Sequence, residues 1–142
     1  MNIKQNKSGF TLLEIIIVII IVGVLASLAL PRFFSTVEYS RSTEALASIG
    51  AVRQSLERCY LQRSGDYTNC ANFGNLDIED PGNSPGAHFT YSFPAGAASV
   101  TAYAIKATRN LVDGGSAASM IVINQAGTAV TRSGVGAFAG IK

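Results

Sequence analysis

The sequence predicts an α+β fold in which one long N-terminal helix packs on a small antiparallel sheet of four strands. Residues 10–30 form an apolar stretch with a single charge, Glu14. Residues 31–63 continue with apolar side chains at steps of three and four, which is typical of an amphipathic helix. Residues 88–132 hold four short segments with strand character, separated by turn residues.

The apolar stretch has the length of a transmembrane helix. Its 21 residues would form a helix about 31 Å long, close to the thickness of a bilayer's hydrocarbon core. The β-branched run at residues 15–22 would favour a strand in water, but a single span in lipid must bond its backbone internally and becomes a helix. A carboxylate in such a span is costly, so Glu14 is expected to have a function.

The helix is expected to run from about Thr11 to about Arg63. Gly23 lowers helix propensity and Pro31 removes a backbone hydrogen bond, so both are predicted weak points where the helix bends. Gly50 is expected either to bend it again or to allow close packing. The apolar stripe that should cover the head consists of Leu46, Ile49, Val52, Leu56, Cys59 and Tyr60.

The remaining elements follow from turn residues and alternation. Residues 64–87 are rich in Gly, Pro, Asn, Asp and Ser and are predicted to be loop. Predicted strands occupy residues 88–93, 99–109, 120–124 and 128–132, and their simplest arrangement is a four-strand antiparallel meander against the helix stripe. The tail from residue 133 onward receives no assignment.

The balance of basic and acidic side chains excludes a dedicated nucleic-acid-binding protein, which would be strongly basic. Of the 11 Lys and Arg side chains, Lys4 and Lys7 precede the apolar stretch, which leaves nine basic against nine acidic side chains. By the positive-inside rule these two lysines place the N-terminus in the cytoplasm, although Arg32 and Arg41 weaken that argument.

The residues around the start of the apolar stretch resemble a known motif. Gly9 to Glu14, GFTLLE, preceded by Lys7 and Ser8, resembles the processing site of the type IV prepilin family, and Pro31 and Gly23 fall where that family has a proline and a helix-weakening glycine. The resemblance is specific over residues 7 to about 35. It implies a leader at residues 1–9, a membrane and assembly segment at 10–30, and a globular head at 31–142.

The resemblance also implies how the chain is processed and assembled. Cleavage would fall between Gly9 and Phe10, followed by N-methylation of Phe10 by a prepilin peptidase and methyltransferase. Glu14 would then pair with the Phe10 amine of a neighbouring subunit. The implied partners are further copies of the chain in a helical homopolymer, together with the inner-membrane assembly machinery. The subunit would start as a single-pass inner-membrane protein, with its head outside the cytoplasm, and end in an extracellular filament.

Cys59 and Cys70 are the only two cysteines, and two readings are open. They could be separate buried thiols. Export of the head to an oxidising compartment favours a disulfide, which would close a loop of about 12 residues and stabilise the head by on the order of 3 kcal/mol.

The remaining polar residues give no firm site. Asp77, Glu79 and Asp80 could supply oxygen ligands to calcium, as some pseudopilins do in their heads, but a solvated acidic loop is the simpler interpretation. His88, the single histidine, is expected at the surface or at a strand edge. No nucleophile, base and acid form a set, so we expect no enzyme, no metal and no cofactor.

Function is therefore expected to be structural. The first hypothesis is a subunit of a type IV pilus-like filament. The alternatives are a pseudopilin of a type II secretion system and, from another class, a monomeric membrane-anchored binding domain. No small-molecule or nucleic-acid partner is inferred.

Overall fold

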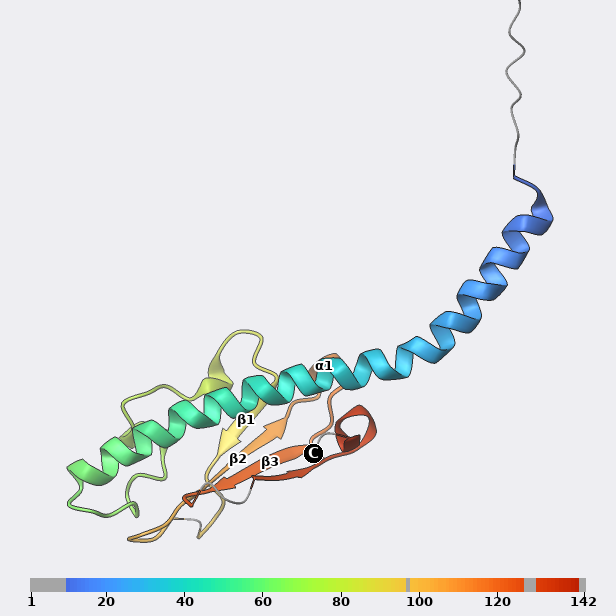
Figure 1. Cartoon of the computed structure of the whole chain (residues 1–142). Coiled ribbons are helices and arrows are strands. Elements are labelled where there is room, and N and C mark those ends of the chain that lie inside the picture. The colour runs from blue at the N-terminus through green and yellow to red at the C-terminus, as the bar shows by residue number, and fades with distance from the viewer. Residues whose placement is uncertain (1–9, 97, 127–129, 141–142) are drawn as a thin grey trace, which may run out of the picture. The chain divides into compact units, whose positions relative to one another are not determined.

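A computed structural model of the 142-residue chain describes residues 10–96, 98–126 and 130–140. These residues divide into two compact units, one ending at Phe34 and the other beginning at Ser35. Figure 1 shows the elements, which are the helix α1 (Leu12–Gln62) and the strands β1 (Phe89–Ser92), β2 (Ala104–Arg109), β3 (Met120–Asn124) and β4 (Val130–Ser133). The predicted α+β fold is confirmed.

The first unit contains the apolar part of α1. The Thr11 hydroxyl caps the helix start, where it accepts a hydrogen bond of 3.3 Å from the backbone N–H of Glu14. The helix continues without interruption through Gly23 and Pro31, so a bend at these two residues stays a prediction. Within the described part of the chain, α1 is the helix long and apolar enough to cross a membrane.

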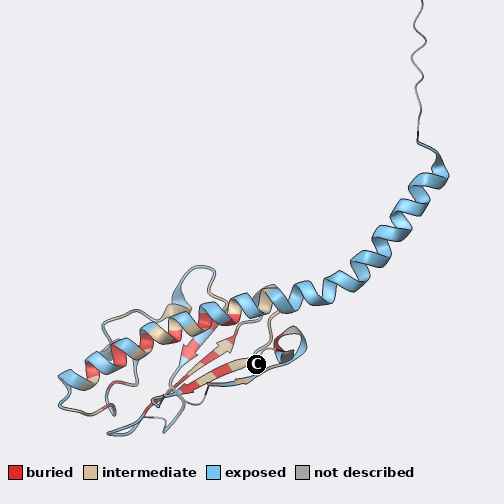
Figure 2. Ribbon diagram, viewed as in Figure 1, coloured by how far each residue is buried: buried red, intermediate tan, exposed pale blue. Residues whose placement is uncertain are grey.

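The second unit contains the amphipathic part of α1, whose buried side chains confirm the predicted period (Figure 2). A Cβ atom at Gly50 would meet nothing within 4 Å, so the close-packing interpretation of this glycine is wrong. Two serines on the buried face were not part of the predicted stripe. The buried residues of α1 are Ser42, Ala45, Ile49, Val52, Ser55, Leu56 and Cys59.

The sheet has the strand order β1-β2-β3-β4 with antiparallel neighbours, which confirms the predicted meander. Alternate residues face α1 and form the core. The second predicted strand was too long at its start, because Ser99 and Ala102 form a turn with N···O distances of 2.8 and 3.1 Å. The inward-facing core residues of the sheet are Phe89, Tyr91, Ile105, Ala107, Ile121 and Ile123.

The connections are stabilised by local caps. Two 3₁₀ turns, Phe73–Asn75 and Pro81–Asn83, interrupt the long loop after α1, and the side chains of Asn72 and Asp80 cap them. The unassigned tail forms another 3₁₀ turn, Gly136–Gly140. Its Phe138 is buried and lies 6.3 Å from the ring of Phe89, so the tail completes one end of the core.

Candidate functional site

The N-terminal segment carries the residues on which the processing prediction depends. Gly9 lies outside the described residues, so the cleavage site itself is not seen. Phe10 is 80% exposed and Glu14 is exposed in the first turn of α1. Among the described residues no side chain pairs with the Glu14 carboxylate.

Around Glu14 the helix surface is almost entirely apolar. Every residue from 10 to 34 is exposed, including the long β-branched run at 15–22 (Figure 2). Soluble monomers rarely expose continuous apolar surface on this scale, and such patches mark membrane or protein contacts. The segment therefore requires lipid or other chains around it.

The head contains a second polar constellation, centred on Arg109 at the end of β2. Its side chain is fully buried and donates to both carboxylate oxygens of Glu38, from Nε and Nη2, at 3.2 Å each. Nη1 donates to the carbonyls of His88 and Asn110 at 3.1 Å, and the guanidinium lies 5.8 Å from the Phe89 ring centre. A buried guanidinium with this many partners joins the sheet to the helix.

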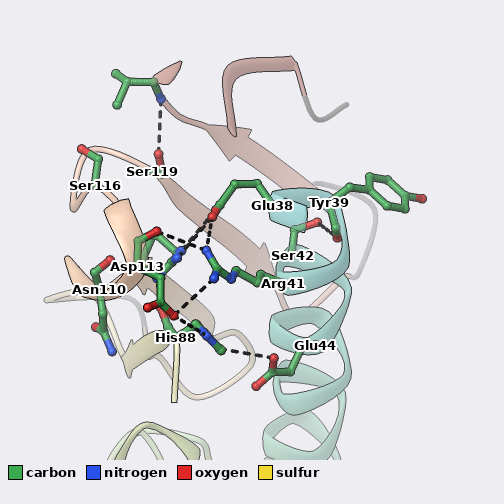
Figure 3. A network of polar contacts seen from close by, with 12 residues as sticks. Glu38, Tyr39, Arg41, Ser42, Glu44, His88, Asn110, Asp113, Ser116 and Ser119 are labelled. Atoms are coloured by element: carbon green, nitrogen blue, oxygen red, sulfur yellow. Dashed lines mark hydrogen bonds and ion pairs between the residues drawn. The ribbon is translucent and has the colours of Figure 1, made fainter. Parts of the chain in front are cut away.

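Glu38 is the anionic centre of this group. Burial acts to raise its pKa, but the hydrogen bonds and charges of Arg109 and Arg41 prevail and hold it below the usual range. Arg41 also reaches the carboxylate of Asp113 at 3.2 Å, which ties the β2–β3 connection to α1 (Figure 3). Glu38 and Arg41 are neighbours on α1, and their ion pair at 2.6 Å lies at the same end of the sheet as Arg109.

Gly115, which has no side chain, leaves room for the Arg109 guanidinium beside the backbone. A Cβ atom at Gly115 would lie 2.0 Å from the Asn110 carbonyl oxygen and 2.7 Å from Cζ of Arg109. Only glycine fits there. The neighbouring hollow, of about 130 Å³, is lined by Glu38, Gly114, Gly115, Ser116, Ser119, Val135, Gly136 and Phe138.

His88 lies directly before β1, an edge strand of the sheet, which agrees with the expected strand-edge position, and its side chain has partners there. It is about one-quarter exposed, and its ring stands between two carboxylates (Figure 3). Nε2 lies 3.3 Å from Asp113 and Nδ1 lies 3.6 Å from Glu44. The loop before β1 therefore joins the same end of the head as Arg41.

At the other end of the head, the predicted disulfide between Cys59 and Cys70 is confirmed. Beside it the Tyr60 and Tyr67 rings stack at 4.3 Å. The Tyr67 and Tyr103 hydroxyls both donate to the Glu57 carboxylate, at 2.7 and 3.2 Å. Burial and the Glu57 carboxylate raise the pKa of Tyr67, so this end is held together by neutral phenols.

The acidic loop is also more structured than a solvated segment. Asp77 accepts hydrogen bonds from Ser55 and Arg58, and these, led by Arg58, hold the pKa of its carboxyl well below the usual range. Asp80 accepts from the Gly82 N–H at 2.8 Å. In the described ranges no three His, Cys, Asp or Glu side chains gather as metal ligands would.

Arg109 is the residue that the sequence analysis missed. Inside the predicted strand 99–109, Arg109 is two residues after Ala107 and four after Ile105. Side chains at every second strand position point to the same face, so Arg109 lies on the inward face. A charge at such a position requires a buried partner, and Glu38 was one of the carboxylates that the predicted helix offers. Strand parity was therefore the signal that could have found the pair.

Comparisons with known proteins support the N-terminal motif. The family model for the prokaryotic N-terminal methylation motif matches residues 4–30. The chain is 34% identical over 58 residues to the type IV major fimbrial protein FimA of Dichelobacter nodosus, covering 41% of this chain and 37% of the relative. It is 35% identical over 82 residues to type II secretion system core protein G of Dickeya chrysanthemi, covering 58% of this chain and 53% of the relative.

These matches span between about a third and a half of the relatives' own length. A solved structure extends the likeness to the fold. The non-core minor pilin PilV of Neisseria meningitidis superposes with a TM-score of 0.57 at 19% identity, covering 76% of this chain and 99% of that one. The chain thus carries the prokaryotic N-terminal methylation motif, resembles type IV fimbrial proteins and type II secretion system core protein G, and has a pilin-like fold.

Proposed function

We propose that this chain is the structural subunit of a type IV pilus-like filament, assembled through its N-terminal apolar helix. The observation that carries the proposal is a methylation-motif match at residues 4–30 on a helix that exposes its whole apolar surface around one carboxylate. A surface of this kind is satisfied by lipid before assembly and by identical helices afterwards.

Processing prepares the charge that assembly uses. Cleavage between Gly9 and Phe10 by a prepilin peptidase creates a new amine at Phe10, which the same machinery methylates. Glu14 then occupies the fifth position of the processed chain. Its carboxylate neutralises the Phe10 amine of a neighbouring subunit, so that two charges enter an apolar filament core as a pair.

The Glu14 carboxylate provides the sharpest test. Glu14→Gln removes one partner of a pair that is buried on assembly, a change that typically costs about 3–5 kcal/mol, and the cost recurs at every added subunit. We expect normal amounts of processed, folded subunit in the membrane and few or no filaments. Immunoblots measure the subunit and electron microscopy measures the filaments.

Glu79→Gln is the matched control, because Glu79 is an exposed carboxylate in the head loop and the chemical change is the same. It should leave filaments at the level of the unchanged chain. Glu14→Asp should retain part of the assembly. Normal filament yield from Glu14→Gln would refute the charge-pair account.

Intact-mass measurement tests the processing step separately. Subunits taken from filaments should begin at Phe10 with a methylated amine. Retention of Met1 to Gly9 in assembled material would contradict the proposal. Replacing Gly9 by a bulky residue should leave uncleaved precursor in the membrane.

The weak points in α1 add a conformational element to the proposal. The segment from Gly23 to Pro31 is helical in the subunit, yet glycine costs about 1 kcal/mol of helix propensity and proline removes a backbone bond. We expect residues 24–31 to become extended in the filament. A filament map with continuous helix there would contradict this.

A pseudopilin of a type II secretion system is the second candidate, favoured by the similarity to core protein G over 58% of the chain. Experiments in cells distinguish the pilus subunit from the pseudopilin. A pilus subunit forms filaments on the surface, whereas deletion of a pseudopilin stops secretion and leaves no surface filament to lose. A membrane-anchored monomer would show no crosslinking between neighbouring N-terminal helices.

A further inference from the structure

We infer that the end of the head nearest α1's apolar segment rests in the interface of the bilayer that holds this segment. The contact is made by an apolar tip, which we define as Leu111, Val112 and Val135. This inference rests on the proposed membrane anchor and names a lipid contact for the head before assembly.

The apolar tip is exposed although it belongs to the folded head. Leu111 is 76% exposed, Val112 54% and Val135 51%. Leu111 directly precedes the 3₁₀ turn between β2 and β3, Val112 is the first residue of that turn, and Val135 follows β4. Val135 lines the same hollow as Gly114, so the two connections are neighbours.

Chain connectivity limits the distance between this tip and the end of the apolar segment. Arg109 holds the start of the β2–β3 connection on Glu38, and Asp113 is bound to Arg41. Glu38 follows Phe34, the last residue of the apolar unit, by only four positions, which span at most about 14 Å of chain. The short connection therefore keeps the tip within reach of the point where the apolar segment leaves the bilayer.

The electrostatics of the two connections permit this contact. Residues 110–119 and 133–140 carry one charged side chain, Asp113. Its carboxylate already has Arg41 at 3.2 Å and the His88 ring at 3.3 Å. Burial of the tip among lipid headgroups therefore leaves no charged side chain without a partner. Each apolar side chain that is buried in the interface strengthens binding to the bilayer.

The tip is chosen as the lipid contact because of its position near the apolar segment, and not only because its apolar side chains are exposed. Leu61 is 78% exposed and Val100 56%, so they match the tip in exposure. Leu61 follows Glu38 by 23 positions along α1, about 35 Å of helix, and the Val100 carbonyl accepts from the Tyr67 N–H at 3.3 Å beside the same helix end. Both residues therefore lie far along the chain and the helix from the point where the apolar segment ends, and the inference does not extend to them.

The absence of tryptophan from the chain allows a direct test. Single substitutions Leu111→Trp, Leu61→Trp and Val100→Trp are made in the full chain and reconstituted in phosphatidylethanolamine and phosphatidylglycerol vesicles. Lipids brominated high on the acyl chain quench only a tryptophan that touches the interface. We expect Leu111→Trp to emit at shorter wavelength and to be quenched, while Leu61→Trp and Val100→Trp are not.

A fourth variant, Ile21→Trp, separates failure of this inference from failure of the anchor. Quenching of Ile21→Trp by deeply brominated lipid shows the apolar helix in the bilayer. With that result, an unquenched Leu111→Trp overturns the inference, and a blue-shifted but unquenched emission means that protein covers the tip instead. Equal quenching of Leu111, Leu61 and Val100 variants also overturns it. An unquenched Ile21→Trp overturns the anchor and the inference together.

Discussion

The two parts of α1 have the same secondary structure and opposite surroundings. From Leu12 to Phe34 the helix exposes every side chain, and its one carboxylate, Glu14, finds no side-chain partner among the described residues. From Ser35 onward the helix buries an apolar face, and Glu38 is bound by two arginines. The Glu38 charge is neutralised within its own chain, whereas a partner for Glu14 from another chain is part of the proposed function.

Under the proposed function, this difference would separate folding and assembly into two parts of a single helix. The head part gains its stability from packing and ion pairs that are complete within one subunit. The apolar part exposes a continuous apolar surface of the kind that marks membrane or protein contacts, and under the proposed function lipid and then identical helices cover it. Substitutions in the two parts should therefore affect different measurements.

Arg109→Met should give the largest loss of head stability. It leaves Glu38 without its main partner, and breaking a buried pair typically lowers the free energy of unfolding by about 3–5 kcal/mol. Chemical unfolding of the full chain in detergent, followed by the near-UV signal of the tyrosines, measures the loss. The double variant with Glu38→Leu should recover part of it, and equal losses in single and double variants would contradict the buried-pair account.

Removing the disulfide should have the next largest effect, again in the head alone. Replacing Cys59 and Cys70 by serine opens a short loop, with a loss of about 3 kcal/mol by the chain-entropy argument. The same unfolding measurement applies. Helix content of the apolar segment in detergent should not change, so a loss of helix there would break the separation between the two parts.

Gly115→Ala should destabilise the head because its Cβ would meet backbone and the Arg109 guanidinium. Overpacking of this kind costs about 1–3 kcal/mol. Gly50→Ala is the matched control of opposite sign, since open space surrounds that position in a helix and alanine favours helix by about 1 kcal/mol. A stable Gly115→Ala head would show that the connection can move away from Arg109.

Lowering the pH should reduce the stability of the head through protonation of Glu38, by less than the substitutions above. Its pKa is lowered in the folded state, so its contribution is complete above the unfolded value of about 4.3 and is lost as pH falls through the lower folded value. Unfolding measured from neutral pH down to about pH 3 should show this loss. Glu38→Gln should flatten part of it, whereas Asp77→Asn should leave the Glu38 part intact.

Most of the fold was predictable because its signals are local. The helix limits came within one residue of the prediction, and the strand at 120–124 was predicted at its observed limits. Where the prediction was wrong, local hydrogen bonds prevailed over alternation, as with Ser99 before β2. The polar partners of Asp77 and His88 were not predictable, since they come from segments far apart in sequence.

The sequence by itself determined the apolar segment, the motif at its start, the position of Glu14 and the periods of helix and strands, because each depends on residues adjacent along the chain. Only the tertiary structure decided that Arg109 is buried on Glu38, that Gly115 makes room for it, and that an apolar tip lies beside the start of the head. Glu38 and Arg109 meet across 71 positions, and Gly115 meets Arg109 through the turn after β2, so packing sets these contacts only when the whole head is folded.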